Sequence, residues 1–117
     1  AELEELQTYT SRVYVHPAIK AYIVDVINTT RGGGPNPLPG LDKHLRMGAS
    51  PRGGIALMKV AQAHALMSGR NYVVPDDVKA MRHSVLRHRL VRTWDAVADG
   101  VSVTGLIDAS FNVVPVP

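Results

Sequence analysis

Apolar residues recur with helical spacing in several stretches of the chain. After Pro17 they lie three, one, three and one residues apart, which places them on one face of a helix. The members of this face are Ile19, Tyr22, Ile23, Val26 and Ile27. Proline suits the first position of a helix and glycine the position after its end. We therefore expect a helix from Pro17 to about Arg31, with Gly32 in a left-handed cap.

A longer helical stretch opens with Ser50-Pro51 and ends at Ser68-Gly69. The Ser50 hydroxyl can cap the helix, and Pro51 fits its first turn. The stretch is apolar nearly all round, with alanines between the larger side chains. A helix with this pattern belongs in the middle of a domain.

A third stretch begins at Val74-Pro75 and places Asp76 and Asp77 in its first turn, where the helix dipole favours carboxylates. We interpret both aspartates as helix starters. The expected core stripe of this helix consists of Val78, Met81 and Val85. Shorter helices are predicted over residues 2–10 and 104–111, and a brief extended piece over 13–15.

Residues 32–40 read Gly-Gly-Gly-Pro-Asn-Pro-Leu-Pro-Gly, which suits neither helix nor strand. We predict a flexible loop over 32–47. It lacks the Gly-Lys pair of a phosphate-binding P-loop, so we interpret it as a connector. The pattern as a whole predicts an all-α bundle of four to five helices over residues 1–112, no convincing sheet, and an extended tail over 113–117.

The amino-acid composition excludes several kinds of functional site. The 117 residues fit one domain, and the absence of cysteine excludes disulfides, thiolate metal sites and a cysteine nucleophile. The five histidines lack metal-ligand spacing, so no metal site is expected. No apolar run approaches the ~20 residues of a membrane span. We expect a cytoplasmic protein without a membrane span. The chain begins with alanine rather than methionine, which suggests a fragment of something longer.

Basic residues gather between Arg82 and Arg92, although the net charge is only +3. Three interpretations stay open: a solvated helix end that complements the dipole, a contact surface for another part of the same protein, or a nucleic-acid contact. No aromatic residue lies among these cations, which disfavours stacking on single strands.

Three segments together resemble a known family. They are Gly48-Ala49-Ser50-Pro51-Arg52, the run from Gly69 to Val78, and Leu86-Arg87-His88-Arg89-Leu90. Their order and spacing are similar to the C-terminal helical lid of the MoxR family of AAA+ ATPases. Tyr22-Ile23-Val24, Thr30-Arg31 and the closing Val-Pro-Val-Pro also resemble that family.

The chain departs from the family pattern at three places. Gly53-Gly54 follows the arginine where the family commonly has alanine, and Val74 stands where a capping threonine is common. The segment 91–103, with Trp94, has no interpretation from the sequence.

The resemblance implies a division of labour. A nucleotide-binding core, N-terminal to the lid, would carry the P-loop, ATP and Mg²⁺. The lid alone would then bind no cofactor, contain no catalytic residue and hydrolyse no ATP. It also implies a chaperone-like machine that assembles as a ring, typically a hexamer. The partners of the lid would be its own ATPase core and the neighbouring subunits, with a client protein that the sequence does not identify.

Arg52 is the residue to which the resemblance assigns a role, that of the sensor-2 arginine. At the second position of a helix, beside unpaired backbone N–H groups, a guanidinium is well matched to phosphate oxygens. Ser50, Pro51 and Gly53 would support this helix start, and Arg87 and Arg89 would contact the core or a neighbouring subunit. The alternatives are an ordinary exposed arginine, a free-standing nucleic-acid-binding module, and a protein-interaction domain without a nucleotide role.

Overall fold

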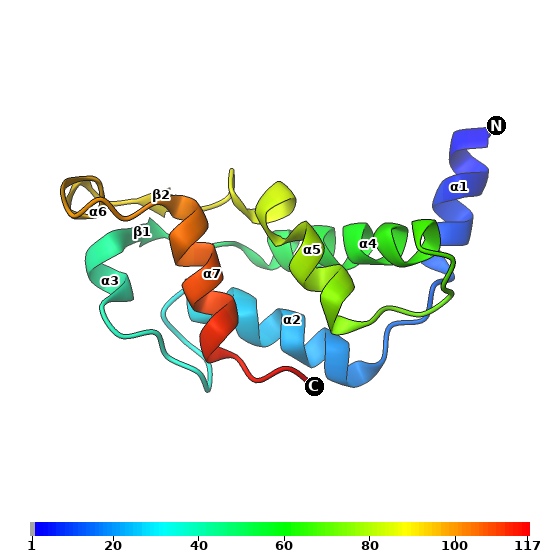
Figure 1. The fold of residues 1–117 in the computed structure, drawn as a ribbon, viewed down its shortest axis with the longest axis horizontal. Coiled ribbons are helices and arrows are strands. Elements are labelled where there is room, and N and C mark those ends of the chain that lie inside the picture. Colours follow the sequence, from blue (N-terminus) through cyan, green and yellow to red (C-terminus); the bar gives the residue numbers. More distant parts are fainter. Residues whose placement is uncertain (1) are drawn as a thin grey trace.

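The computed structural model describes residues 2–117, apart from the side chains of residues 2, 3, 6 and 7. This part of the chain contains seven helices and one two-stranded ribbon (Figure 1). The elements are α1 (Glu2–Ser11), α2 (Pro17–Thr30), α3 (Leu41–His44), β1 (Leu45–Met47), α4 (Pro51–Met67), α5 (Pro75–Leu86), β2 (Val91–Arg92), α6 (Trp94–Ala98) and α7 (Val103–Val113). The predicted all-α class is confirmed.

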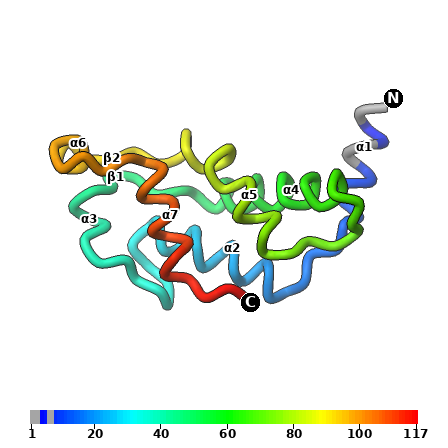
Figure 2. The backbone as a smooth tube through the Cα atoms, in the orientation of Figure 1, coloured from blue at the N-terminus to red at the C-terminus, as the bar shows by residue number. Residues whose placement is uncertain are grey.

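Helix α4 is the longest element, and α1, α2 and α5 all pack against it. Helix α7 crosses the bundle and contacts both α2 and α5 (Figure 1). The molecule is elongated, with extents of 47 × 28 × 20 Å. Figure 2 shows α1 at one end and the ribbon with α6 at the other.

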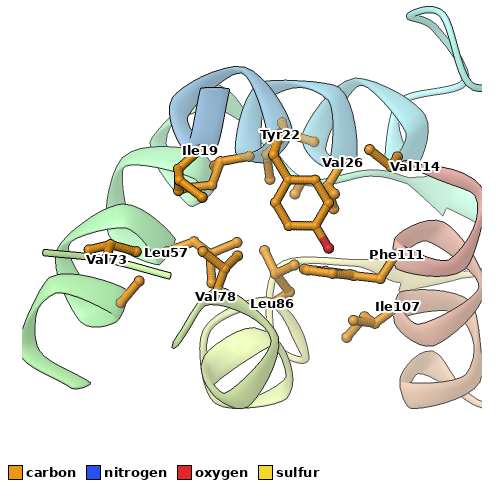
Figure 3. Packing of buried hydrophobic residues seen from close by; sticks show 14 of the residues in the cluster. Ile19, Tyr22, Val26, Leu57, Val73, Val78, Leu86, Ile107, Phe111 and Val114 are labelled. Atoms are coloured by element: carbon orange, nitrogen blue, oxygen red, sulfur yellow. The ribbon is translucent and has the colours of Figure 1, made fainter. Parts of the chain in front are cut away.

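The core forms where α2, α4, α5 and α7 meet, as Figure 3 shows. The predicted apolar face of α2 is buried at all five positions, which confirms the periodicity argument. Tyr22 meets Phe111 edge to face, with ring centroids 6.1 Å apart. Leu57 of α4 and Val78 of α5 are fully buried in the same cluster.

Helix α4 is less enclosed than its composition predicts. Leu57, Ala61 and Ala65 are buried, but Ile55 is 52% exposed and Met67 is 89% exposed. Helices α1, α2 and α5 pack against α4 without surrounding it, so part of its surface stays exposed. An apolar composition all round the helix therefore leaves uncovered apolar surface in the isolated chain.

The prediction of an all-helical chain with a loop over 32–47 is wrong in part. Residues 41–44 form α3, and residues 45–47 form β1, which pairs antiparallel with β2. Helices α3 and α6 are too short to show a helical period, and the partner of β1 lies far along the chain. Thr93 could have indicated the start of α6 from the sequence, because threonine is a common N-cap residue and its hydroxyl accepts from the Ala96 N–H.

Two smaller predictions are confirmed. Gly32 has φ +76°, the left-handed conformation expected after α2. The extended piece 13–15 finds a partner in the turn before α5, where Tyr14 forms a parallel bridge with Tyr72.

Candidate functional site

The start of α4 has the predicted backbone. Ser50 is the extended N-cap residue (φ −80°, ψ 167°), and Pro51 and Arg52 are the first and second helical positions. The predicted cap through the Ser50 hydroxyl is wrong, because that hydroxyl forms no capping hydrogen bond. The backbone N–H of Gly53, one of the usual donors to such a cap, donates instead to the Ser50 carbonyl at 2.8 Å.

The segment before α4 is fixed tightly against the end of α2. The Ala49 N–H donates to the buried Thr30 hydroxyl at 3.1 Å, and the Arg31 guanidinium donates to the Ala49 carbonyl at 3.4 Å. Only glycine fits at position 48, because a Cβ atom there would overlap the carbonyl oxygen of Thr30. Direct packing on α2 therefore sets the place from which Arg52 projects.

Arg52 itself is exposed and has no hydrogen-bond or ion-pair partner among residues 2–117. The first turn of α4 also contains no acidic residue. A permanent cation thus stands beside a helix start whose dipole is positive, an arrangement that is unfavourable in isolation and favours binding of an anion.

Two further arginines lie against the same helix start. Arg31 reaches it through the Ala49 carbonyl. The Cδ atom of Arg89 lies 3.4 Å from where a Cβ of Gly53 would be, so its side chain runs alongside buried Gly53. Neither arginine forms an ion pair within the described part of the chain. Arg31, Arg52 and Arg89 are called the arginine cluster below.

An apolar groove of about 370 Å³ lies between α2 and α4 and reaches the first turn of α4. Pro51 and Gly54 line it on the α4 side, together with Ile55, while Val24 lines it on the α2 side. Val24 and Ile55 are each more than half exposed. The groove therefore offers apolar surface that the described residues leave uncovered.

The start of α5 has a different chemistry, because its acid is fully paired. Asp77 is buried and accepts two hydrogen bonds from Arg70, each at 2.7 Å. It also accepts from the Val74 N–H at 2.8 Å and pairs with His64 at 2.7 Å. Burial alone would raise the pKa of Asp77, but hydrogen bonds from Arg70, Val74 and His64 outweigh it and hold the pKa at about 2.

The interpretation of Asp77 as a helix starter is thus confirmed. His64 has a structural place beside it, paired with the same carboxylate. Sequence analysis missed Arg70 as the partner of Asp77. This pairing could have been predicted from the sequence, because Arg70 and Asp77 lie close together in the chain, at the connection between two predicted helices.

The basic run does not act as one unit. Arg82 and His83 both approach Asp108 of α7, at 2.8 Å and 3.0 Å, and Arg92 donates to the Val101 carbonyl. Arg87 is exposed beyond the end of α5 and has no side-chain partner among the described residues. Of the two predicted contact residues, only Arg89 lies beside the start of α4.

An exposed patch that the sequence did not interpret lies at the far end of the molecule. Trp94 is 88% exposed and Met47 is 61% exposed. Trp94 lines a shallow cleft with Arg46 and Arg92. The structure provides no contact that explains this tryptophan.

The described part of the chain, residues 2–117, contains neither a candidate metal site nor a candidate membrane-spanning helix. No group of three or more histidine, aspartate or glutamate side chains there could hold a metal ion. No helix in that range has the length and apolar character needed to cross a membrane.

Comparison with known proteins identifies the fold. Residues 41–108 match the AAA lid domain family, which is more than half of the chain. The chain belongs to this family. The lid is also 36% identical over 116 residues to chaperone MoxR1 of Mycobacterium tuberculosis, and the match covers 99% of the lid and 31% of that protein. Protein MoxR of Methylorubrum extorquens is 33% identical, with 99% of the lid and 36% of that protein covered.

A solved structure agrees with this assignment. The crystal structure of a candidate ATPase from Cytophaga hutchinsonii superimposes on the lid with a TM-score of 0.87 at 28% identity, covering 94% of the lid and 33% of that chain. The lid therefore spans about a third of the length of the relatives that it matches. The resemblance to MoxR-type AAA+ ATPases is confirmed.

Proposed function

We propose that this lid closes over a nucleotide held by an ATPase core elsewhere in the same protein, and that Arg52 contacts the phosphates as a sensor-2 arginine. ATP and Mg²⁺ would belong to the core, as membership of the AAA lid domain family suggests for the whole ATPase. The lid would transmit the nucleotide state to neighbouring subunits of a ring, typically a hexamer, that remodels or activates a client protein.

One observation carries this proposal: Arg52 is unpaired and exposed, yet its helix start is rigidly placed by Gly48 and Thr30. A fixed scaffold with a free guanidinium is what preorganised recognition of a phosphate requires. Because the guanidinium is always charged, its contacts differ between ATP and ADP and can favour different lid positions.

The apolar groove also supports a position of the lid in which the start of α4 faces the ATPase core. Its lining includes Pro51 and Gly54 of the first turn of α4 as well as the exposed Val24 and Ile55, so the ATPase core could cover Arg52 and the groove with one surface. Covering this groove would remove apolar area from water and help to hold the lid in place.

The experiment is ATP hydrolysis by the full-length ATPase that carries this lid. Arg52→Ala should lower kcat/KM at least about tenfold, because a charge-assisted contact to the transferring phosphate is lost. Lys59→Ala is the matched control, since Lys59 is an exposed cation seven residues further along α4, on the same face. Its turnover should stay within about twofold of the unaltered protein.

Normal turnover of a folded Arg52→Ala variant would contradict the proposal and leave Arg52 as an ordinary surface arginine. A second measurement uses the 117-residue chain alone, which should release no phosphate from ATP. Turnover that persists through successive purification steps would show that the lid contains a catalytic site of its own.

A further inference from the structure

The fold uses only part of the Arg89 side chain. Its Nε donates to the Val85 carbonyl at 3.2 Å, beside the end of α5. Its terminal nitrogens have no acceptor among the described residues. The same terminal nitrogens form the fork that binds two phosphate oxygens at once.

The backbone around Arg89 is firmly held. Its N–H donates to the Leu86 carbonyl at 2.9 Å, and the flanking Leu86 and Leu90 are both buried in the core. The aliphatic part of the side chain runs beside Gly53, the residue after Arg52. An alanine at position 53 would make ordinary contact with this chain, whereas a larger residue would displace it.

Arg31 and Arg87 are used differently. Arg31 gives one terminal nitrogen to the Ala49 carbonyl and so helps to hold the segment before α4. Arg87 lies two residues from Arg89, and its side chain forms no hydrogen bond or ion pair with the described residues. Apart from Arg52 itself, Arg89 is the arginine in the described part of the chain that combines packing on the first turn of α4 with a guanidinium whose terminal nitrogens are both unused.

We propose that Arg89 is a second phosphate-contacting residue, which binds the same triphosphate as Arg52. This inference rests on the proposed function, because the triphosphate belongs to the core. It assigns Arg52 and Arg89, from two different segments of the lid, to one anion. The alternative is that Arg89 only caps α5 through Val85.

The test is a double-mutant cycle in the full-length ATPase, with kcat/KM for ATP and the melting temperature measured for each variant. Arg89→Ala should lower kcat/KM about tenfold, the size expected for one hydrogen-bonded charge pair. Lys59→Ala, the control used above, should stay within about twofold. The variant that lacks both Arg52 and Arg89 should lose less than the product of the two single losses, because the residues share one ligand.

Arg89→Gln keeps the side chain as far as Cδ, the atom that packs on Gly53, but removes the charge. It should lose activity like Arg89→Ala without a change in melting temperature. If Arg89→Ala and Arg89→Gln turned over ATP as fast as Lys59→Ala while Arg52→Ala stayed impaired, this inference would be overturned and the proposed function would stand. Single losses that multiply in the double variant would also overturn it. Full activity of Arg52→Ala would instead count against the proposed function.

Discussion

The starts of α4 and α5 have the same backbone plan and opposite electrostatics. Both helices begin with proline after an extended residue whose side chain forms no cap. At α5, the Asp77 carboxylate satisfies a backbone N–H and is itself neutralised by Arg70. At α4 there is no acid, and Arg52 has no partner within residues 2–117.

This difference distinguishes a purely structural contact from a surface that can bind a ligand. The contact of Asp77 with Arg70 and the Val74 N–H is called the α5 joint below. The α5 start is complete by itself, since its buried carboxylate, Asp77, is paired with Arg70 inside the fold. The α4 start is equally well fixed in space, but its cations are left unpaired. A protein that only needed to stabilise α4 would place acids there, as it does at α5. The cationic start of α4 therefore favours an interpretation based on an external anion.

The largest expected effect is at the α5 joint. Asp77→Ala leaves Arg70 and the Val74 N–H without their acceptor, so the free energy of unfolding should fall by about 3–5 kcal/mol. The measurement is urea denaturation of the chain. Asp76→Ala is the matched control, because Asp76 is exposed in the same turn; it should change stability by less than about 1 kcal/mol. Equal losses for the two variants would show that the buried pairing of Asp77 contributes nothing special.

Gly48→Ala tests how firmly the α4 start is placed. The added methyl group overlaps the Thr30 carbonyl, which is backbone and cannot rotate away, so we expect a loss of about 3 kcal/mol. Gly33→Ala is the control, because a Cβ there meets nothing closer than the Asn28 carbonyl oxygen at 3.9 Å. A Gly48→Ala variant as stable as the control would mean that the segment before α4 can shift freely.

Acid should weaken the α5 joint over a defined pH range. The pKa of Asp77 is lowered from 3.8 to about 2, so its contribution is present above about pH 4 and is lost as the pH falls through 2. The shift corresponds to about 2 kcal/mol. Stability measured at several pH values should show this loss in the unaltered chain and not in Asp77→Asn. Parallel curves for the two proteins would assign the acid sensitivity to other carboxylates.

The smallest expected effect is at Arg52. Because its side chain is exposed and unpaired, Arg52→Ala should change the free energy of unfolding of the chain by less than about 0.5 kcal/mol. Thermal unfolding of the isolated chain provides the measurement. A loss well above that value would show that Arg52 has a role inside the fold, which would remove the contrast with α5.

Local patterns predicted the long helices and the helical position of Arg52, because periodicity and a Ser-Pro start are properties of neighbouring residues. They could not predict the β1–β2 ribbon or the packing of Arg89 on Gly53, since both join segments that are distant in the chain. The Ser50 cap failed for a local reason, because the Gly53 N–H that could have donated to the hydroxyl donates to the Ser50 carbonyl instead.

The close packing at Gly48 has a mechanical consequence. With no space between Thr30 and the segment that leads into α4, the end of α2 and the front of α4 cannot slide past each other. The two segments must therefore move together as one rigid unit. Under the proposed function, a displacement of phosphates bound at Arg52 would then move both helices together within the elongated molecule.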